Sequence, residues 1–168
     1  DGAARRVDVF ARGPAGPAAD ALIRAYGGEV SAAGRVDANG RRALDLDPGS
    51  WVVVAVSEAL GITQRDVDVV SANAPLPVEL VLTEPAAERG DVLGEVVDPA
   101  GAPVRGAVLN VGGGDRPAEM PLGDNGIAVL NDTRIGPLTL RVAAPGYKPG
   151  RAEILDVGVG VQTRRLRL

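Results

Sequence analysis

Residues 94–108 read GEVVDPAGAPVRGAV, and this stretch indicates how its half of the chain folds. The run at residues 92–98 is typical of a strand, and the Pro- and Gly-rich segment at residues 99–103 ends it. A second strand is expected at residues 107–111, so the stretch predicts two strands joined by a turn. The same order of features occurs earlier in the chain, around Pro17 and Ala21.

The chain repeats itself at one constant offset. The dipeptide Asn39-Gly40 returns 86 residues later as Asn125-Gly126. Other pairs at this offset are Pro17 and Pro103, Ala21 and Ala107, Leu80 and Leu166, and Leu82 and Leu168. We therefore predict two copies of one module, residues 1–84 and residues 85–168, each near the lower end of the usual domain size. The connection at residues 83–91 is expected to be short and semi-stiff.

The composition favours many short strands. Hydrophobic residues make up 45% of the 168 residues, too many for a disordered chain. No apolar run approaches the ~20 residues that a membrane helix needs. The chain contains 23 Gly and 13 Pro, which suits strands joined by turns. No helical pattern is long enough for crossovers between parallel strands, so we predict an all-β fold of two tandem β-sandwiches.

Local signals predict individual elements. The nearly continuous apolar run of residues 51–56 predicts a central strand, and residues 19–26 predict another strand. The Asn-Gly dipeptides predict tight hairpin-type turns, in which both residues tolerate a positive φ. Residues 57–61 and residues 85–88 are each expected to form a single helical turn.

The charge is unevenly divided between the two halves. Residues 1–84 carry 8 Arg against 12 acidic residues, a net charge of −4, whereas residues 85–168 carry 10 basic and 10 acidic residues. Neither half is basic enough to predict binding of nucleic acid. The local basic patch is Arg164, Arg165 and Arg167; its alternative interpretation is the outward face of a closing strand whose inward face is Leu166 and Leu168.

The chain contains no His and no Cys. Disulfides, zinc sites built on these residues and Ser-His or Cys-His nucleophile pairs are therefore excluded. Asp66 and Asp68 alternate along a predicted strand, as do Asp45 and Asp47. Either pair is a candidate for acid–base chemistry, but a solvent-facing strand edge is the favoured interpretation. We predict no catalytic residues.

Turn residues are the remaining candidates for ligand binding. Asp37 with Asn39, or Asp124 with Asn125, supplies oxygen atoms suitable for calcium. The favoured alternative is that these side chains bond to their own backbone in turns. The glycines of residues 112–114 are not followed by the Lys and helix of a phosphate loop. We predict no metal and no cofactor.

The second half resembles the carboxypeptidase regulatory-like family. The resemblance is carried by residues 94–108, which match the family's "D-x-x-G-x-P-V-x-G-A" turn between two strands. Residues 142–147 resemble its "apolar-x-A-x-G-Y" segment, and residues 165–168 its closing strand. This resemblance implies a transthyretin-like (prealbumin-like) sandwich of the seven-strand type.

The first half is similar to the same family, but less closely. Residues 37–41 and 44–51 resemble the family's "D-x-x-G … L-x-P-G-x-Y" stretch, and residues 17–21 stand in for its P-V-x-G-A element. The Gly-Tyr segment is missing, and residues 60–62 occupy its place. The shape of this loop is therefore expected to differ.

The resemblance implies a non-catalytic structural or protein-interaction module of a larger secreted, periplasmic or cell-envelope bacterial assembly. The expected partners are other protein domains or subunits, without nucleic acid and without a transmembrane segment. The candidate interaction surface is Arg164, Arg165, Arg167 and Tyr147. One alternative is carbohydrate binding, for which Tyr147 is the best placed aromatic ring. Another is an accessory domain of a peptidase or an outer-membrane transporter. Transthyretin-like hydrolases rely on His, so that activity is not expected here.

Overall fold

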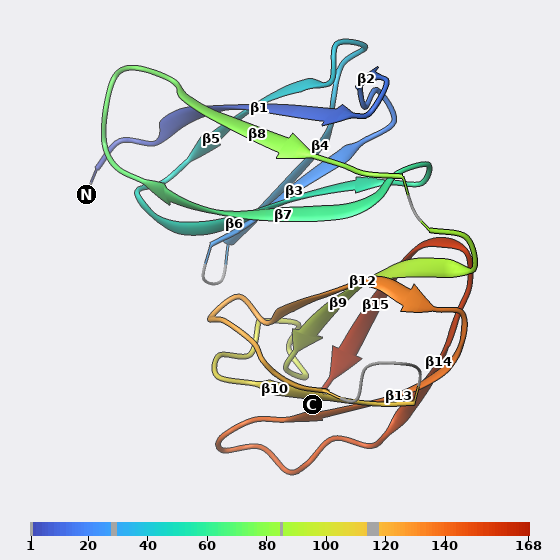
Figure 1. The fold of residues 1–168 in the computed structure, drawn as a ribbon. Helices are drawn as coiled ribbons and strands as arrows, with labels where there is room; N and C mark the ends of the chain where they lie inside the picture. The colour runs from blue at the N-terminus through green and yellow to red at the C-terminus, as the bar shows by residue number, and fades with distance from the viewer. Residues whose placement is uncertain (1, 28–29, 85, 114–117) are drawn as a thin grey trace. The chain divides into compact units, whose positions relative to one another are not determined.

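The computed structural model describes residues 2–27, 30–84, 86–113 and 118–168. Within these residues the chain forms fifteen β-strands and no helix, which confirms the predicted all-β class. None of the described residues belongs to a helix that is long and apolar enough to cross a membrane. The chain divides into two compact units, Asp1–Glu84 (unit 1) and Pro85–Leu168 (unit 2). In each unit the strands lie in two facing layers (Figure 1).

Unit 1 is a sandwich of two four-stranded sheets. Its described strands are β1 (Arg5–Gly13), β2 (Gly16–Pro17), β3 (Leu22–Gly27), β4 (Val30–Arg35), β5 (Arg41–Leu46), β6 (Gly49–Ser57), β7 (Gly61–Val69) and β8 (Leu76–Val81). In one sheet, β1 pairs in antiparallel orientation with β2 and β5 and in parallel orientation with β8. The other sheet has the order β4-β3-β6-β7. The predicted central strand at residues 51–56 is therefore confirmed, because β6 lies between β3 and β7.

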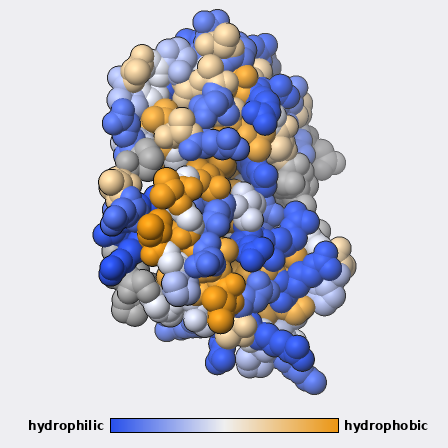
Figure 2. All heavy atoms as spheres, turned by 90° about the vertical axis from the view of Figure 1, so that its right-hand side faces the viewer, coloured by the Kyte–Doolittle hydropathy of each residue, from blue (hydrophilic) through white to orange (hydrophobic). Residues whose placement is uncertain are grey.

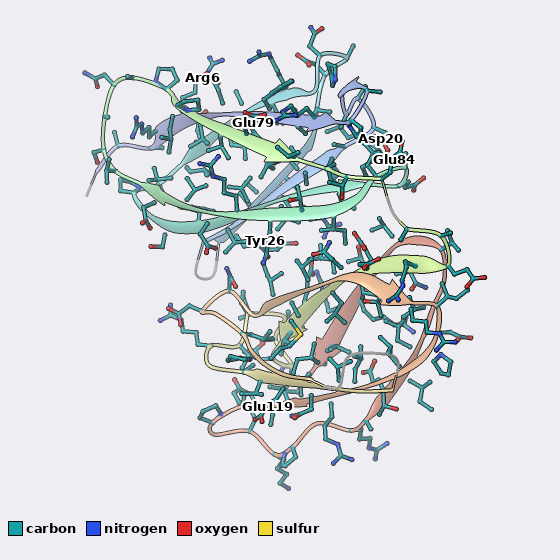
Figure 3. The ribbon with its side chains drawn as sticks, in the orientation of Figure 1. Arg6, Asp20, Tyr26, Glu79, Glu84 and Glu119 are labelled. Carbon is teal, nitrogen blue, oxygen red and sulfur yellow. The ribbon has the colours of Figure 1, made fainter. Side chains whose placement is uncertain are left out.

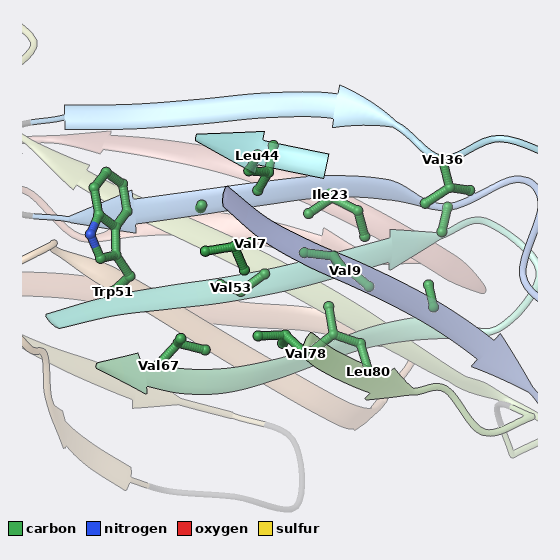
Figure 4. Packing of buried hydrophobic residues seen from close by; sticks show 14 of the residues in the cluster. Val7, Val9, Ile23, Val36, Leu44, Trp51, Val53, Val67, Val78 and Leu80 are labelled. Carbon is green, nitrogen blue, oxygen red and sulfur yellow. The ribbon is translucent and has the colours of Figure 1, made fainter. Parts of the chain in front are cut away.

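The core of unit 1 fills the space between these sheets (Figure 4). Alternate residues of β1, β3, β6 and β8 point inward, among them Val7, Val9, Ile23, Val53 and Leu80. Trp51 closes one end of this core, with its indole N–H donating to the carbonyl of Asp47 at 2.9 Å. A Cβ on Gly27 would lie 2.6 Å from the Trp51 ring, so only glycine lets the ring pack there.

Unit 2 repeats this architecture with seven described strands. They are β9 (Arg89–Val97), β10 (Val108–Gly112), β11 (Ala118–Pro121), β12 (Ile127–Arg134), β13 (Gly136–Ala143), β14 (Glu153–Val157) and β15 (Gly160–Arg167). One sheet has the order β12-β9-β15, with β15 parallel to β9, and the other has the order β11-β10-β13-β14. The core between them consists mainly of Val, Leu and Ala, with Leu109 and Leu138 among its most buried members.

The two units share backbone hydrogen bonds at matching positions. Three of the matched pairs can be compared directly. Leu82 N–H donates to Arg12 O (2.8 Å), as Leu168 N–H does to Val97 O (3.1 Å). Ala11 N–H donates to Gly40 O (2.8 Å), as Val96 N–H does to Gly126 O (2.7 Å), and Val36 N–H donates to Ala21 O (3.1 Å), as Leu122 N–H does to Ala107 O (2.8 Å). The two-residue strand β2 corresponds to an isolated bridge between Val97 and Pro103. The sequence repeat therefore reflects one backbone frame formed twice.

The Asn-Gly turns carry the chain from one sheet to the other. Gly40 N–H donates to Asp37 O at 2.9 Å, and Gly126 N–H donates to Gly123 O at 3.2 Å. Within these two turns a positive φ is found only at Gly40 (+72°) and Gly126 (+64°) and not at the preceding Asn. The prediction of primed turns was therefore wrong. The geometry resembles a type I turn followed by a left-handed glycine.

Two other local predictions were also wrong. Residues 57–61 form the tight connection between β6 and β7 rather than a helical turn. The strand predicted at residues 19–26 begins only at Leu22, because residues 19–20 form a turn. Strands β4 and β11 were not predicted at all. The helical turn expected at residues 85–88 includes residue 85, which lies outside the described residues.

Candidate functional site

The three predicted arginines lie on β15, the edge strand that closes unit 2. The register pairs Arg164 with Gly94, Arg165 with Glu95 and Arg167 with Val97 on the parallel strand β9. Arg164 is two residues from the buried Leu166 and therefore lies in the same, inward row of the strand. Arg165 and Arg167 lie in the outward row. The interpretation that all three form one outward face was wrong. Arg164 is nevertheless exposed, since β15 is the edge of its sheet.

Only one of the three arginines is paired within the described part of the chain. The Arg165 guanidinium donates to the carboxylate of Glu95 on the neighbouring strand, with an Nη2–Oε2 distance of 3.1 Å. Arg164 and Arg167 have no carboxylate partner among the described residues. These two guanidiniums therefore keep their donors available for an external acidic group.

Tyr147 lies in the connection between β13 and β14, which runs over residues 144–152. Its backbone N–H donates to Ala144 O at 3.2 Å, and the next residues leave the sheet until Gly150 N–H bonds to Val142 O at 3.0 Å. The Tyr147 side chain is 41% exposed. The chain's only lysine, Lys148, is exposed beside it.

The Tyr147 loop and the end of β15 approach each other. A Cβ on Gly150 would lie 3.5 Å from the Leu168 side chain, directly after Arg167. Toward the start of β15, the Gln162 side chain donates to Asp156 O at 3.0 Å and so joins β15 to β14. Arg164 lies two residues further along the same row. The structure thus brings the Tyr147 loop next to the end of β15 that carries Arg167.

Exposed hydrophobic residues accompany these cations. The exposed large hydrophobic residues of unit 2 are Ile135, Tyr147, Ile154 and Val159, with exposed fractions of 39%, 41%, 73% and 74%. Figure 2 shows hydrophobic residues in patches among hydrophilic ones on the face that it draws. Ile154 belongs to the edge strand β14, two residues before the Asp156 carbonyl that Gln162 contacts. The strand β14 and the connection that follows it therefore expose the apolar side chains of Ile154 and Val159.

The aromatic residues offer little surface for stacking a sugar ring. Trp51 is 6% exposed within the core of unit 1, and the face of Phe10 is covered by Arg41, whose Cζ lies 5.0 Å from the ring centroid. Tyr147 is the one aromatic side chain that is exposed, and all four aromatic residues lie in the described part of the chain.

The carboxylate pairs lie on solvent-facing strand positions. Asp66 and Asp68 are exposed while Val67 and Val69 are buried, as the favoured interpretation predicted. Asp68 accepts a hydrogen bond from the hydroxyl of Ser50 at 2.7 Å. Asp45 and Asp47 are likewise exposed. Such carboxylates lack the buried, water-poor setting that prepares an acid–base pair for catalysis.

The turn residues bond to their own backbone. Asp37 Oδ1 accepts the N–H groups of Asn39 and Arg41, both at 2.9 Å, and Asn125 Oδ1 accepts the N–H of Ile127 at 3.4 Å. Among the residues that the structure describes, no group of three or more metal-ligating side chains comes together. Gly112 ends β10, and residue 114 of the glycine-rich segment lies outside the described residues.

Unit 1 carries a hollow that was not predicted from the sequence. It has a volume of about 340 Å³ and is lined by Arg6, Asp8, Val9, Asp37, Arg41, Arg42 and Ala43; we call it the Ala43 hollow. Figure 3 shows Arg6 on the side of β1 that faces away from the core. The sequence signal is the pair of similar runs RRVD (residues 5–8) and RRALD (residues 41–45), but their pairing is visible only from the β1–β5 register.

Residues 91–167 match the carboxypeptidase regulatory-like domain. The match covers nearly all of unit 2 and the residues that carried the predicted resemblance, so that prediction is confirmed. No curated protein matches the sequence of the chain.

Solved structures show likeness at low sequence identity. The Bacillus anthracis TIE protein has a TM-score of 0.44 and 13% identity, over 99% of this chain and 34% of that protein. A streptococcal ancillary pilin has a TM-score of 0.42 and 16% identity, over 99% of this chain and 63% of the pilin. The shaft pilin SpaA from Lactobacillus rhamnosus GG has a TM-score of 0.40 and 8% identity, over 98% and 96% of the two chains. The chain spans about a third of the TIE protein and less than two thirds of the ancillary pilin.

Proposed function

We propose that the chain is a non-catalytic structural or protein-interaction module of a larger bacterial assembly that is secreted or part of the cell envelope. In this proposal unit 1 is a second regulatory-like module, since it repeats the strand order and the backbone hydrogen bonds of unit 2. The expected partners are other protein domains or subunits. The observation that carries the proposal is the edge strand β15: Arg164 and Arg167 are exposed on it and have no acidic partner among the described residues, and its Arg167 end lies next to the Tyr147 loop.

The chemistry of this edge favours an acidic protein surface. Arg164 and Arg167 present guanidinium groups that match carboxylates in geometry, and both remain without an acidic partner in the described structure. Tyr147 adds a rigid ring with a polar end, a residue type enriched at protein interfaces. Arg165 has a different role, because its bond to Glu95 ties β15 to β9.

The proposal can be tested by site-specific photo-crosslinking in the source cell. A photoreactive residue would replace Tyr147, Arg164 or, as a matched control on the same unit, the exposed Thr139 of β13. We expect positions 147 and 164 to crosslink to the same protein and position 139 to give no adduct. Joint Arg164→Glu and Arg167→Glu substitution should abolish the adduct at position 147. Equal labelling at position 139, or no adduct at 147 and 164, would contradict the proposal.

A further inference from the structure

The strands β8 of unit 1 and β15 of unit 2 occupy the same place in the repeated frame. β8 pairs in parallel with β1, as β15 does with β9, and neither pairs with a second strand among the described residues. At their ends the amides of Leu82 and Leu168 donate to carbonyls of those neighbours. Since successive residues of a strand direct their backbone N–H and C=O groups to opposite sides, the odd-numbered residues of both strands face the open edge.

The edge of β8 is closed to a further strand. Pro77 faces this edge without an N–H group, and the carbonyl of Glu79 accepts a hydrogen bond from Arg65 Nη1 of β7 at 3.3 Å. Val78, between these two residues, points inward and is buried in the core of unit 1. Proline and capping side chains are devices that protect a sheet edge from pairing with another chain.

The edge of β15 has neither device at the corresponding positions. The residues 86 positions after Pro77 and Glu79 are Thr163 and Arg165, so an amide is present where unit 1 has a proline. Among the described residues, no backbone hydrogen bond joins residues 163–167 to a strand other than β9. This part of β15 therefore presents backbone donors and acceptors to an incoming strand.

A side chain closes only the start of this edge. Gln162 donates to Asp156 O at 3.0 Å and accepts the N–H of Gly158 at 3.3 Å, so its amide fills the place of a backbone peptide beside β14. Beyond it, residues 163, 164, 165 and 167 are exposed. The open part of the edge thus begins at residue 163.

Arg164 restricts which strand can bind there. It stands in the inward row at the position that Val78 holds in unit 1, and it is exposed. It has no acidic partner among the described residues, Glu153 and Asp156 of β14 included. A strand added beside β15 would cover this guanidinium and remove its water, which is strongly unfavourable for an unpaired charge. The incoming strand must therefore carry a carboxylate next to Arg164.

We propose that β15 binds an extended segment of a partner protein as an added antiparallel strand, with an acidic side chain of that segment paired to Arg164. The inference rests on the proposed function and specifies how the acidic partner binds. Antiparallel pairing is the more stable arrangement per residue. Arg167 offers a second guanidinium on the outward row, whereas Arg165 is already bonded to Glu95. Two copies of β15 would bring like charges together, so a different strand is required.

The test is amide hydrogen exchange of the full chain with the peptide Ac-TVTETVT-NH2 and its neutral counterpart Ac-TVTQTVT-NH2. We expect the acidic peptide, at ten times its Kd, to slow exchange at Thr163, Arg165 and Arg167 about tenfold. The amide of Arg164 already faces β9 and should change little. The neutral peptide should bind at least about tenfold more weakly. Equal effects from the two peptides, or no protection from either, would overturn the proposal.

Unit 1 supplies a matched variant for the backbone contacts. Thr163→Pro introduces the proline of unit 1 and removes one edge amide, whereas Thr163→Ala keeps that amide. We expect Thr163→Pro to abolish protection of the Arg165 amide although every arginine remains, and Thr163→Ala to preserve it. Slow exchange at Leu168 shows that each variant is folded. Equal protection in both variants would mean that charge alone holds the peptide, and the added strand would be wrong.

The edge of β8 is an internal control in the same experiment. The amides of Glu79 and Val81 face that edge, but Pro77 and the bond from Arg65 close it. We expect neither amide to gain protection with either peptide. Protection equal to that of β15 would show that the peptides pair with any strand edge, which would overturn the assignment to β15.

A second matched variant tests the charge requirement. Arg164→Val introduces the residue that unit 1 has at the corresponding position, Val78. This variant should bind the neutral peptide at least as tightly as the acidic one, because no guanidinium is left in the inward row. A preference for the acidic peptide that persists in Arg164→Val would overturn the role of Arg164.

Two further outcomes separate this inference from other accounts. In sedimentation without peptide, a dimer of the full chain whose edge amides are protected would show that a second copy fills the edge, and the assignment to another protein would be wrong. Photo-crosslinking from position 164 without peptide protection of the edge would leave the proposed function in place and overturn the added strand. Protection by the acidic peptide without any cellular crosslink would support the strand site and contradict the proposed function.

Discussion

Units 1 and 2 differ most at the connection between the last two strands of the sheets β4-β3-β6-β7 and β11-β10-β13-β14. In unit 1, β6 and β7 are joined by residues 58–60, and the hydroxyl of Ser57 holds this turn by donating to Asp20 Oδ2 at 2.8 Å and accepting the N–H of Leu60 at 3.0 Å. In unit 2, the corresponding strands β13 and β14 are joined by residues 144–152, which expose Tyr147 and Lys148. At the next connection the lengths are reversed, with residues 70–75 in unit 1 and residues 158–159 in unit 2.

This difference shows which parts of the module are fixed and which are free to vary. The buried rows and the matched backbone hydrogen bonds are the same in both units, because each is needed to close the sandwich. The connections lie at the surface, where a change in loop length costs little free energy. Side chains available for binding are therefore found on the loops and edges, as in many domains with rigid frames.

The largest expected effect tests the shared core. Ile23 and Leu109 are buried at positions 86 residues apart, with exposed fractions of 0% and 1%. Ile23→Ala and Leu109→Ala should each lower the free energy of unfolding of their own unit by about 2–5 kcal/mol, because each leaves a cavity. The single Trp of the chain, Trp51, lies in unit 1 and reports its unfolding in urea by fluorescence.

The two core variants should behave differently in that measurement. Ile23→Ala should move the Trp51 transition to lower urea, whereas Leu109→Ala should leave it in place and change only the circular dichroism transition. If Leu109→Ala moved the Trp51 transition as far as Ile23→Ala does, the units would not be separate folding bodies.

A smaller effect is expected at the two left-handed glycines. A Cβ on Gly40 would lie 2.4 Å from Ala11 O, and one on Gly126 would lie 2.6 Å from Val96 O. Gly40→Ala and Gly126→Ala should each cost about 1–3 kcal/mol, since a strained φ and a close contact with a carbonyl act together. Gly101→Ala is the control, because Gly101 has φ +92° but open space around it. Thermal unfolding that ranked Gly101→Ala as the most damaging would contradict this account.

Ser57→Ala tests what holds the short turn of unit 1. Ser57 is fully buried, and its hydroxyl bridges Asp20 and the N–H of Leu60. The variant leaves that N–H without its acceptor, so we expect a loss of about 1–3 kcal/mol in chemical denaturation. Ser50→Ala removes an exposed hydroxyl bonded to Asp68 and should cost less than about 0.5 kcal/mol. Equal losses in the two variants would mean that the turn does not depend on Ser57.

The smallest effect is expected in the corresponding loop of unit 2. Tyr147→Ala removes an exposed ring and should change the free energy of unfolding by no more than about 0.5 kcal/mol. The same variant should abolish photo-crosslinking from position 164 if Tyr147 contributes to the partner surface. A large loss of stability would assign Tyr147 to the frame instead of to binding.

The sequence predicted the frame well because its signals are local or repeated. Val and Leu alternate along β1, β5 and β8, and the repeat of Asn-Gly, Pro and Leu positions indicated the duplication. Strands β4 and β11 were missed because VSAAGR and AEMP contain too few apolar residues to show alternation. These strands are held at the sheet edges by pairing with β3 and β10.

The candidate sites were less predictable, because they depend on register and on edges. The sequence could not show that Arg164 shares a row with Leu166 yet remains exposed, since this follows from β15 being an edge strand. The Ala43 hollow requires Ala43 to face Asp8 and Arg41 to face Phe10, and these pairs are more than thirty residues apart in the chain. Likewise, the helical turn expected at residues 57–61 is replaced by a tight connection in which Ser57 bonds to Asp20, a residue distant in sequence.

Amide hydrogen exchange of the unmodified full chain tests most directly whether the two units share one backbone frame. The matched donors are Leu82 and Leu168, Ala11 and Val96, and Val36 and Leu122. We expect all six amides to exchange slowly, while the amides of Lys148 and Arg151, in the exposed loop of unit 2, exchange fast. Slow exchange at the three donors of one unit with rapid exchange at their counterparts in the other would contradict the account.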